Sequence, residues 1–341
     1  MTSSMTPKTM RALVLSKASG AAHPSLSFSP AHPVPAPLPG HVLVRVHASA
    51  IQPSDIYNSE GGFGSTTFPR IPGRDFSGVV VSSTPGPDAD QSRSWQPGTA
   101  VFGTSGATHA FTADGFHAEY ALVPANGVVP KPAVLSHVQA ATMGVPWTTA
   151  ALTVEKSEAA KGQTVLVLGA NGAVGSAACH LLQARGCRVL RGIRGPGADV
   201  DTAADPGLDT IRELPGVENG LNAVIDAVGS PALTRAAIDK ALGQGGKLVF
   251  IAAPKGDKPI PELTFNMRDF YRLDKSLVGV NSIARDVSTM AALLKEVVNV
   301  MSDAQWKQVM SGSKWEEVAL EDAVAAYQSQ DRKRKFVIKM I

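Results

Sequence analysis

The amino-acid sequence predicts an α/β protein in which a doubly wound parallel sheet accompanies a second, β-rich domain. Three observations lead to this fold class. The chain has 341 residues, enough for about two domains. Short strands and proline-rich turns fill residues 1–128, whereas helix-compatible runs alternate with apolar strands from about Ser136. A glycine-rich turn joins an apolar strand to a helix near the middle of that second region.

The composition narrows the function classes before any motif is considered. Charged residues make up 18% of the chain and hydrophobic residues 44%, with 32 glycines and 24 prolines. This combination excludes a coiled coil and argues against an intrinsically disordered chain. The net charge of +3 does not predict nucleic-acid binding, which usually requires a concentrated basic face. We interpret the one basic run, 332–335, as a solvated turn before a final strand.

The cysteine count and the apolar stretches bear on the cellular compartment. Two cysteines, Cys179 and Cys187, cannot form a four-cysteine zinc lobe or a disulfide framework, which predicts a reducing, cytoplasmic environment. Residues 132–154 and 162–184 lack charged side chains, but proline, glycine, histidine and glutamine interrupt them. We therefore expect buried elements of a protein without membrane spans. The apolar run 12–15 is too short for a signal peptide.

The first region is expected to be all-β with irregular loops. Seven prolines between Pro24 and Pro53 exclude long helices there. Polar and apolar residues largely alternate over 41–48, as in a half-buried strand. Further short strands are expected over 78–82, 100–103 and 119–123.

The second region has the sequence pattern of a parallel sheet that is covered by helices on both faces. Nearly continuous apolar strands are separated by helical runs, which is typical of strands buried on both sides. Strands are predicted over 164–168, 188–190, 223–225 and 247–252, and helices over 175–184 and 231–242. Beyond residue 283 we expect helices over 287–301 and 320–328 and a last strand.

The glycine-rich turn is the most informative motif. Gly169, Gly172 and Gly175 follow the strand 164–168 and open the helix 175–184. Glycines in this position let the backbone turn tightly and approach a pyrophosphate, whose charge is favourable at a helix N-terminus. The sequence predicts a dinucleotide site, and a plain tight turn between strand and helix is the alternative.

The residues after the second strand of this region indicate which dinucleotide binds. An NAD site usually has an acidic residue there, which hydrogen-bonds the ribose 2′-hydroxyl. Here the strand leads into Arg191 and Arg194 instead. Guanidinium groups suit a 2′-phosphate through charge-assisted hydrogen bonds, so NADP(H) is favoured over NAD(H). The alternative is that these arginines only solvate a loop.

Several segments together resemble the medium-chain dehydrogenase/reductase superfamily, in its zinc-independent quinone oxidoreductase or enoyl reductase branch. The resemblance covers nearly the whole chain and implies a GroES-like catalytic domain of residues 1–128 and 283–341 around a Rossmann NADP(H)-binding domain of residues 129–282. It also implies a homodimer formed through the last sheet strand, 276–282. The segments in order are 50–57, 72–80, 115–120, the glycine turn, 224–229, 245–249 and 270–282.

The resemblance also bears on metal binding, because zinc-containing relatives carry a cysteine in the first segment and a His-Glu pair in the second. Here Ser54 stands near the cysteine position and Arg74-Asp75 replaces the pair. Serine is a poor zinc ligand and arginine is none, so no metal is expected. The absence of a Lewis acid argues against ordinary alcohol dehydrogenation, and conjugated acceptors need less activation for hydride transfer than simple ketones.

The resemblance implies a set of site residues. Tyr57 matches a tyrosine near the nicotinamide, and it either donates to the substrate oxygen or only packs there. Asp55, Asp75 and Glu119 are expected to brace the structure. Either Thr148 or Thr149 is expected near the nicotinamide or its phosphate. The expected cofactor-binding residues are Gln52, Thr148, Gly169, Asn171, Gly172, Ala173, Val174, Gly175, Arg191, Arg194, Val228, Ala252 and Asn281.

One departure from the resemblance affects the cofactor. Relatives usually place a helix carrying a lysine after the second Rossmann strand, whereas Gly195-Pro196-Gly197 follows here and predicts a truncated or missing helix. The leading hypothesis is an NADPH-dependent reductase of quinones or activated C=C bonds. A trans-acting enoyl or alkenal reductase in a biosynthetic pathway and a non-catalytic NADPH-binding protein remain open. The size of the pocket near Tyr57, Phe63 and Phe270 would distinguish the two enzymes.

Overall fold

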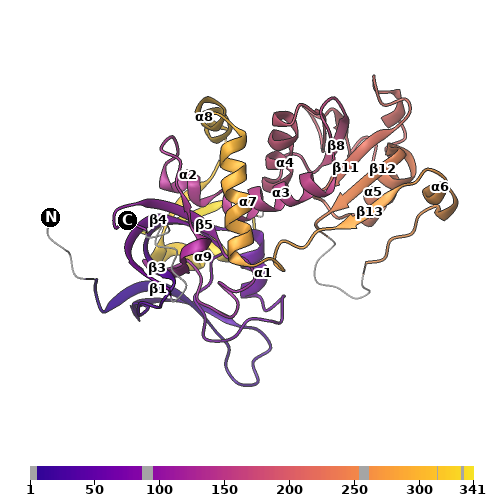
Figure 1. Ribbon diagram of the computed structural model, residues 1–341. Helices are drawn as coiled ribbons and strands as arrows, with labels where there is room; N and C mark the ends of the chain where they lie inside the picture. The colour runs from indigo at the N-terminus through magenta and orange to yellow at the C-terminus, as the bar shows by residue number, and fades with distance from the viewer. Residues whose placement is uncertain (1–5, 87–94, 253–260, 313, 332–333) are drawn as a thin grey trace. The chain divides into compact units, whose positions relative to one another are not determined.

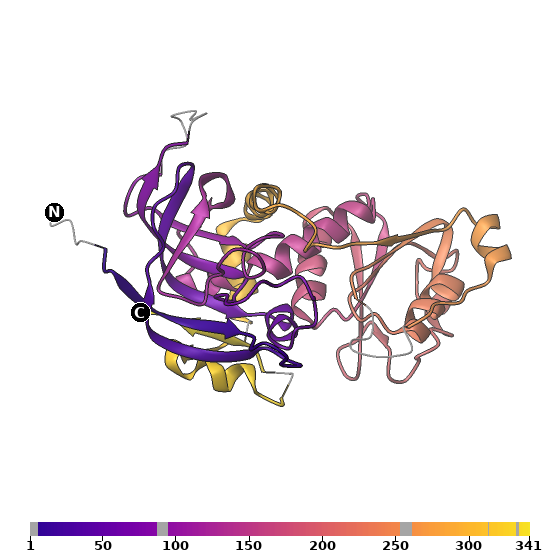
Figure 2. The same cartoon turned by 90° about the horizontal axis from the view of Figure 1, so that it is seen from below.

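The computed structural model describes residues 6–86, 95–252, 261–312, 314–331 and 334–341. The chain forms two units. Unit 1 comprises Met1–Val145 and Ile283–Ile341, and unit 2 comprises Pro146–Ser282. In both views of the ribbon, the indigo beginning and the yellow end of the chain lie together in unit 1 (Figures 1 and 2). Unit 2 is therefore inserted between the two parts of unit 1.

Unit 1 is built on a seven-stranded sheet. Its strand order is β14-β15-β3-β4-β5-β7, and β6 pairs with β3. The strands are β3 (His41–Ile51), β4 (Asp75–Thr84), β5 (Ala100–Thr104), β6 (Tyr120–Pro124), β7 (Val129–Pro130), β14 (Glu316–Ala319) and β15 (Phe336–Lys339). A separate two-stranded sheet pairs β1 (Thr9–Ser16) with β2 (Ser25–Pro33), neither of which was expected.

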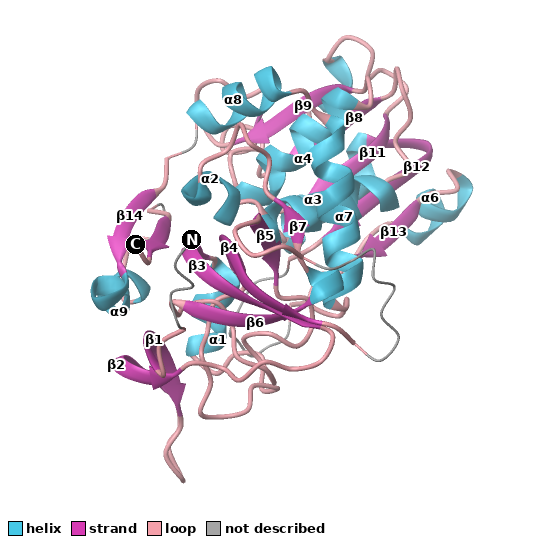
Figure 3. Ribbon diagram, turned by 60° about the vertical axis from the view of Figure 1, so that its left-hand side comes forward, coloured by secondary structure: helices cyan, strands magenta, loops and turns pink. Residues whose placement is uncertain are grey.

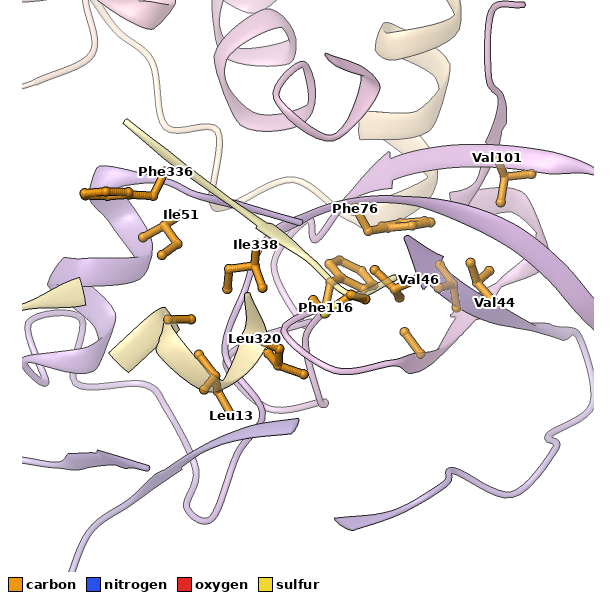
Figure 4. Close-up of a cluster of buried hydrophobic side chains, with 14 of the residues drawn as sticks. Leu13, Val44, Val46, Ile51, Phe76, Val101, Phe116, Leu320, Phe336 and Ile338 are labelled. Carbon is orange, nitrogen blue, oxygen red and sulfur yellow. The ribbon is translucent and has the colours of Figure 1, made fainter. Parts of the chain in front are cut away.

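The core of unit 1 joins residues that are far apart in the sequence. Val44 and Val46 of β3, Phe76 of β4 and Ile338 of β15 belong to one buried cluster, which Figure 4 shows as sticks. The rings of Phe76 and Phe116 lie 4.4 Å apart. Because β15 pairs antiparallel with β3, the end of the chain completes the same core as its first strands.

The structure divides the chain after residue 145, whereas the sequence predicts a boundary after residue 128. Residues 129–145 belong to unit 1, because β7 pairs with β5 and the backbone N–H of Val145 donates to the Asp75 carboxylate at 2.8 Å. The other division falls between Ser282 and Ile283.

The first region is not all-β, because α1 (Pro53–Ser59) lies directly after β3. Pro53 occupies its first turn, and Gln52 and Asp55 form a reciprocal capping box. These features satisfy donors at the helix start that would otherwise be unpaired. The other helices of unit 1 are α2 (His137–Ala141), α7 (Val287–Val300), α8 (Asp303–Ser311) and α9 (Ala323–Tyr327), with short 3₁₀ turns at Ala125–Gly127 and Leu320–Asp322. Helix α3 (Gly144–Lys156) begins in unit 1 and continues in unit 2.

Unit 2 contains a six-stranded sheet in which every pair is parallel. Its order, β10-β9-β8-β11-β12-β13, is that of a doubly wound dinucleotide-binding sheet. Figure 3 shows its strands in magenta. They are β8 (Thr164–Leu168), β9 (Arg188–Ile193), β10 (Val200–Asp201), β11 (Leu221–Asp226), β12 (Leu242–Phe250) and β13 (Ser276–Gly279). The helices are α4 (Ala173–Ala184), α5 (Pro231–Ala236) and α6 (Met267–Arg272), with a π-helical turn at Ala237–Ala241 and a 3₁₀ turn at Ile211–Glu213.

No helix joins β9 to β10 in this fully described segment. Residues 194–199 make the connection, with Gly195 and Gly197 at φ of 85° and 82°. The carboxylate of Asp201 accepts hydrogen bonds from the backbone N–H groups of Gly195 and Ala203, which holds the turn.

Two sequence expectations for helices differ from the structure. The run 231–242 contains α5 and the π-helical turn, and Leu242 already belongs to β12. Helix α8 was not expected, although Ser302 and Gln305 form a capping box at its start.

Of the basic run, Arg332 and Lys333 lie outside the described residues, and Arg334 pairs with Glu316. Within the described ranges, every helix falls short of the length and hydrophobicity needed to cross a membrane.

Candidate active site

The glycine-rich turn of unit 2 connects β8 to α4. Gly169 has φ of 78°, a conformation that glycine adopts without strain. A Cβ at Gly175 would lie 2.2 Å from the carbonyl oxygen of Gly169, so only glycine permits this approach of helix to turn. The N–H of Gly172 donates to the same oxygen at 2.8 Å. The turn thus has the geometry that its glycine spacing predicts.

Helix α4 begins without a side-chain cap. Gly172 occupies the N-cap position and supplies no side-chain hydrogen bond to the first turn. The backbone N–H groups of Ala173, Val174 and Gly175 therefore keep their capacity to donate, at the end of the helix that carries partial positive charge. This end of α4 can bind a phosphate group.

Arg191 extends the turn with a positive charge. Its Nη2 donates to Oδ1 of Asn171 at 2.7 Å, and its backbone N–H donates to the Asp199 carboxylate at 2.8 Å. Arg191 at the end of β9 and Asn171 in the turn are thereby held together. Arg194 lies two residues beyond Gly192 and is exposed.

The turn after β11 lies beside the glycine-rich turn. A Cβ at Gly169 would meet Cγ2 of Val228 at 3.0 Å, and Val228 is 46% exposed. Asp226 organises this turn, because its buried carboxylate accepts from the N–H groups of Val228 and Gly229 and from Thr234 Oγ1 at 2.6 Å. Asp226 is not among the site residues expected from the sequence, although an acidic residue at the end of a buried strand is a usable signal.

The remaining expected residues of unit 2 lie in varied settings. Thr148 and Thr149 are buried in α3, Ala252 follows β12, and Asn281 is exposed beyond β13. Phe270 packs against Phe265, with ring centroids 4.7 Å apart, and both rings are partly buried against the core of this unit.

Unit 1 contains a buried polar cluster formed by Gln52, Asp55, Arg74 and Asp75. Gln52 links its two carboxylates: its backbone N–H donates to Asp55 Oδ2 at 2.7 Å, and its Nε2 donates to Asp75 Oδ2 at 2.8 Å. Gln52, which was expected at the cofactor, therefore has a structural partner in Asp75. Asp75 stands at the position where zinc-containing relatives carry glutamate.

Burial dominates the electrostatics of this cluster. It raises the pKa of Asp55 to about 7 and that of Asp75 to about 6, against the opposing influence of the Arg74 charge. Burial also lowers the pKa of Arg74, while the two nearby aspartates act to raise it. A carboxylate taken out of water is costly unless it is fully paired. Asp55 Oδ1 has no hydrogen-bond partner among the described residues, which fits its raised pKa.

The Arg74 guanidinium is held by hydroxyl groups. Nε donates to Ser105 Oγ at 2.9 Å and Nη1 donates to Ser54 Oγ at 3.1 Å. Within the described part of the chain, its Nη2 has no hydrogen-bond partner. Ser54 and Arg74, the two residues that replace zinc ligands in the resemblance, thus contact each other.

Tyr57 lies on α1 at one end of a row of aromatic rings. Its ring meets that of Phe63 edge-on at 4.9 Å, and Phe63 meets Phe111 edge-on at 5.4 Å. Arg74 lies 5.7 Å from the centre of the Phe111 ring. A Cβ at Gly62 would come within 2.3 Å of the Tyr57 ring, so this glycine sets the ring's position.

His117 and Tyr327 form a second buried pair in unit 1. His117 Nε2 lies 3.2 Å from the carbonyl oxygen of Ala50, so this nitrogen carries the proton. Nδ1 then accepts from the Tyr327 hydroxyl at 3.0 Å. Burial lowers the pKa of His117 to about 4, which keeps the ring neutral. Sequence reasoning missed this pair, since its members are far apart in the chain.

Other titratable groups have structural partners. Glu119 pairs with Arg11 at 2.9 Å. Cys179 and Cys187 are free thiols and buried. Over the described ranges, no group of three or more histidine, cysteine, aspartate or glutamate side chains could hold a metal ion.

Comparisons with known proteins agree with this architecture. Residues 38–133 match the alcohol dehydrogenase GroES-like domain. A zinc-type alcohol dehydrogenase-like protein of Schizosaccharomyces pombe is 39% identical over 310 residues, which cover 90% of each chain. The quinone oxidoreductase of Mus musculus is 28% identical over 313 residues, which cover 86% of each chain.

A solved structure shares the fold over the whole length. A mycobacterial protein complexed with NADPH superposes with a TM-score of 0.74 at 23% identity, covering 97% of this chain and all of the other. The extent of the match to the yeast relative shows the family as well as the fold. This chain belongs to the medium-chain dehydrogenase/reductase superfamily of oxidoreductases.

Proposed function

We propose that this oxidoreductase uses NADPH to reduce quinones or activated C=C bonds of α,β-unsaturated carbonyl compounds. The observation that carries the proposal is the Arg191–Asn171 hydrogen bond beside the uncapped start of α4. It combines a phosphate-binding helix end with a held guanidinium. The name of the mouse relative, quinone oxidoreductase, supports the proposed acceptor. The NADPH bound in the mycobacterial structure supports the proposed cofactor.

The residues of unit 2 fit the cofactor. Gly172 would bring no side chain into the turn, and the N–H groups of residues 173–175 would donate to the pyrophosphate. Arg191 would bind the 2′-phosphate with the donors that Asn171 leaves free, since a guanidinium has five N–H groups. Arg194, Val228, Thr148, Ala252 and Asn281 are the further proposed cofactor contacts.

The residues of unit 1 would act on the acceptor. When bound, NADPH supplies a hydride. Tyr57 would donate its phenolic hydrogen bond to the acceptor oxygen or deliver a proton to the product. The half-buried rings of Tyr57 and Phe63 offer a flat conjugated molecule an apolar surface. An acceptor of this kind needs only orientation and one donor, because its reduced form is a delocalised anion.

The test is an NADPH-oxidation assay across quinones, 2-alkenals and enoyl thioesters, run in parallel with NADH and with metal analysis of the purified protein. We expect turnover with at least one quinone or enone, preference for NADPH, and no stoichiometric zinc. Preference for enoyl thioesters would identify the biosynthetic alternative. Tight NADPH binding with no turnover for any acceptor would contradict the proposed reaction and favour a binding protein.

A further inference from the structure

The Asp75 side chain is fully buried where three elements of unit 1 meet. Asp75 is the first residue of β4. Its Oδ1 accepts a hydrogen bond from the backbone N–H of Val145, in the first turn of α3, at 2.8 Å. Its Oδ2 accepts one from Nε2 of Gln52, the N-cap residue of α1, also at 2.8 Å. One carboxylate therefore joins the starts of two helices to the start of a strand.

The start of α3 fits closely against this carboxylate. A Cβ at Gly144 would lie 2.1 Å from Asp75 Oδ1, so only glycine permits the observed approach. Helix α3 has 13 residues, and the partial positive charge at its N-terminus favours a carboxylate. Burial raises the pKa of Asp75 to about 6, which leaves the group mostly ionised at neutral pH, with both oxygens as acceptors. The start of α3 thus cannot move without moving the carboxylate.

The second hydrogen bond of Asp75 leads to Tyr57. Gln52 precedes α1, and its backbone N–H donates to Oδ2 of Asp55 inside that helix at 2.7 Å. Both residues are buried, so solvent offers no substitute for these hydrogen bonds. Helix α1 has seven residues, of which Tyr57 is the fifth. A displacement of the helix start is therefore carried to the Tyr57 ring, which meets Phe63 edge-on at 4.9 Å.

We propose that Asp75 is a positioning residue for Tyr57, because its carboxylate fixes the start of α1 against the start of α3 and so sets where the Tyr57 hydroxyl meets the acceptor. The inference rests on the proposed function, in which Tyr57 donates to the acceptor oxygen. Asp75 itself does not touch the acceptor and transfers neither hydride nor proton. A displaced donor loses rate steeply, since a misplacement of about 1 Å can cost on the order of a hundredfold.

Fluorine NMR measures the position of Tyr57 without cofactor or acceptor. The chain has four tyrosines, so labelling with 3-fluorotyrosine gives few resonances, and Tyr57→Phe identifies that of Tyr57. The edge-on ring of Phe63 makes this resonance sensitive to small displacements. Gln52→Leu removes the donor to Asp75 and should shift the resonance by more than its linewidth. The resonance of Tyr271, which is 63% exposed, should not move.

Gly144→Ala tests the hydrogen bond that reaches α3. Its Cβ must displace Asp75 Oδ1, so this change outside α1 should also shift the Tyr57 resonance. Added to Gln52→Leu, it should have little further effect, because the link to α1 is already broken. Asp75→Asn keeps an oxygen for Val145, and rotation of the Gln52 amide lets its oxygen accept from the new amide group. This conservative variant should retain the wild-type resonance.

Turnover shows whether the position matters for the reaction. Gln52→Leu and Gly144→Ala should each lower kcat with a quinone about tenfold or more, whereas Asp75→Asn should keep most of it. Gln52→Leu should leave the Kd for NADPH unchanged. Ser302→Ala, which removes the cap of α8, is the control for lost stability and should lower Tm while kcat and the Tyr57 resonance stay as in wild type. If Gly144→Ala does not fold, Gln52→Leu and Asp75→Asn decide the question.

The outcomes separate the two proposals. Absence of NADPH turnover in the wild type contradicts the proposed function, whereas the NMR measurement still decides whether Asp75 positions Tyr57. An unmoved Tyr57 resonance in folded Gln52→Leu overturns the inference. A shifted resonance with wild-type kcat overturns it as well, because the position of the ring would then not limit the reaction. So does a large loss of kcat in Asp75→Asn with an unmoved resonance, since charge rather than position would then be the cause.

Discussion

Nη2 of Arg191 donates to Oδ1 of Asn171 across 2.7 Å, which ties the end of β9 to the glycine-rich turn. The two residues belong to separate segments, and neither hydrogen-bonding group is deeply buried. Holding a long side chain in one place removes rotamer freedom before a ligand arrives. The pair therefore prepares Arg191 for an anionic group beside the N-terminus of α4.

Removal of the Arg191 guanidinium should weaken NADPH binding more than NADH binding. Charge-assisted hydrogen bonds to phosphate contribute about 1.5–3 kcal/mol, so Arg191→Ala should raise the Kd for NADPH about 10- to 100-fold. Asn171→Ala should have a smaller effect of the same kind. Fluorescence titration with both cofactors measures this, and Arg188→Ala on the same strand is the control. An equal loss for NADH would show that Arg191 does not bind the 2′-phosphate.

Gly62 gives a way to move Tyr57 without changing it. An alanine Cβ at this position would lie within 2.3 Å of the ring, so Gly62→Ala must displace Tyr57. We expect kcat with a quinone to fall toward that of Tyr57→Phe, about a hundredfold below wild type if the hydroxyl donates. The double variant should be little worse than either single one, because both remove the same contact.

A matched glycine substitution controls for the added methyl group. A Cβ at Gly312 would have its nearest neighbour at 3.9 Å, so Gly312→Ala should keep both turnover and Tm. Full turnover by Tyr57→Phe would leave packing as the only role of this ring.

The raised pKa of Asp55, about 7, predicts a specific pH dependence of stability. In the unfolded chain this carboxyl ionises near its ordinary value of 3.8, whereas in the folded protein it keeps its proton to about pH 7. Stability attributable to this group is fully present below pH 3.8 and is lost as the pH rises to about 7. Asp55→Asn keeps an acceptor for the Gln52 N–H and cannot ionise.

The difference in Tm between Asp55→Asn and wild type should therefore increase from about pH 4 to pH 7 and stay constant above it. Thermal unfolding at a series of pH values measures this difference. Taking this difference removes the contribution of His117, which is the same in both proteins. The lowered pKa of His117, about 4, makes the protein lose stability as the pH falls below 6.5. A difference that is constant across pH would contradict the raised pKa.

The Tyr327 hydroxyl should contribute measurably to stability through His117. Tyr327→Phe leaves the buried Nδ1 of His117 without its donor, which costs about 1–3 kcal/mol. Urea unfolding should show a lower midpoint with an unchanged slope. Tyr271→Phe, at a ring that is 63% exposed, should have little effect. Equal stability of the two variants would mean that the buried hydrogen bond contributes nothing net.

The sequence predicts best where structure depends on neighbouring residues. The strand 164–168, the turn at Gly169 and the helix after it are local, and the structure forms them with only small changes of boundary. The short connection after β9 is also local, because Gly195, Pro196 and Gly197 cannot sustain a helix. The order of the parallel strands follows from the resemblance and the alternation of elements.

Features that depend on distant partners were not predictable in the same way. In the sequence, Arg74 indicates only that a metal ligand is missing. Nothing near it in the chain predicts its hydrogen bond to Ser105, which is 31 positions away. The membership of residues 129–145 depends on pairing with β5 and on the Asp75 carboxylate. Helix α1 is a partial exception, since Pro53 and the Gln52–Asp55 box are local signals that the prolines before them obscured.

The insertion of unit 2 into unit 1 sets an order of events during synthesis on the ribosome. Strand β15 pairs with β3 over Phe336–Ile51 to Lys339–Ala48, and all of unit 2 is translated between the two strands. Unit 2 is continuous in sequence and can form its sheet as soon as it emerges. The edge of β3 that pairs with β15 therefore stays without this partner while unit 2 is being translated. Nascent chains stalled before residue 336 should therefore be the species that depend most on chaperones.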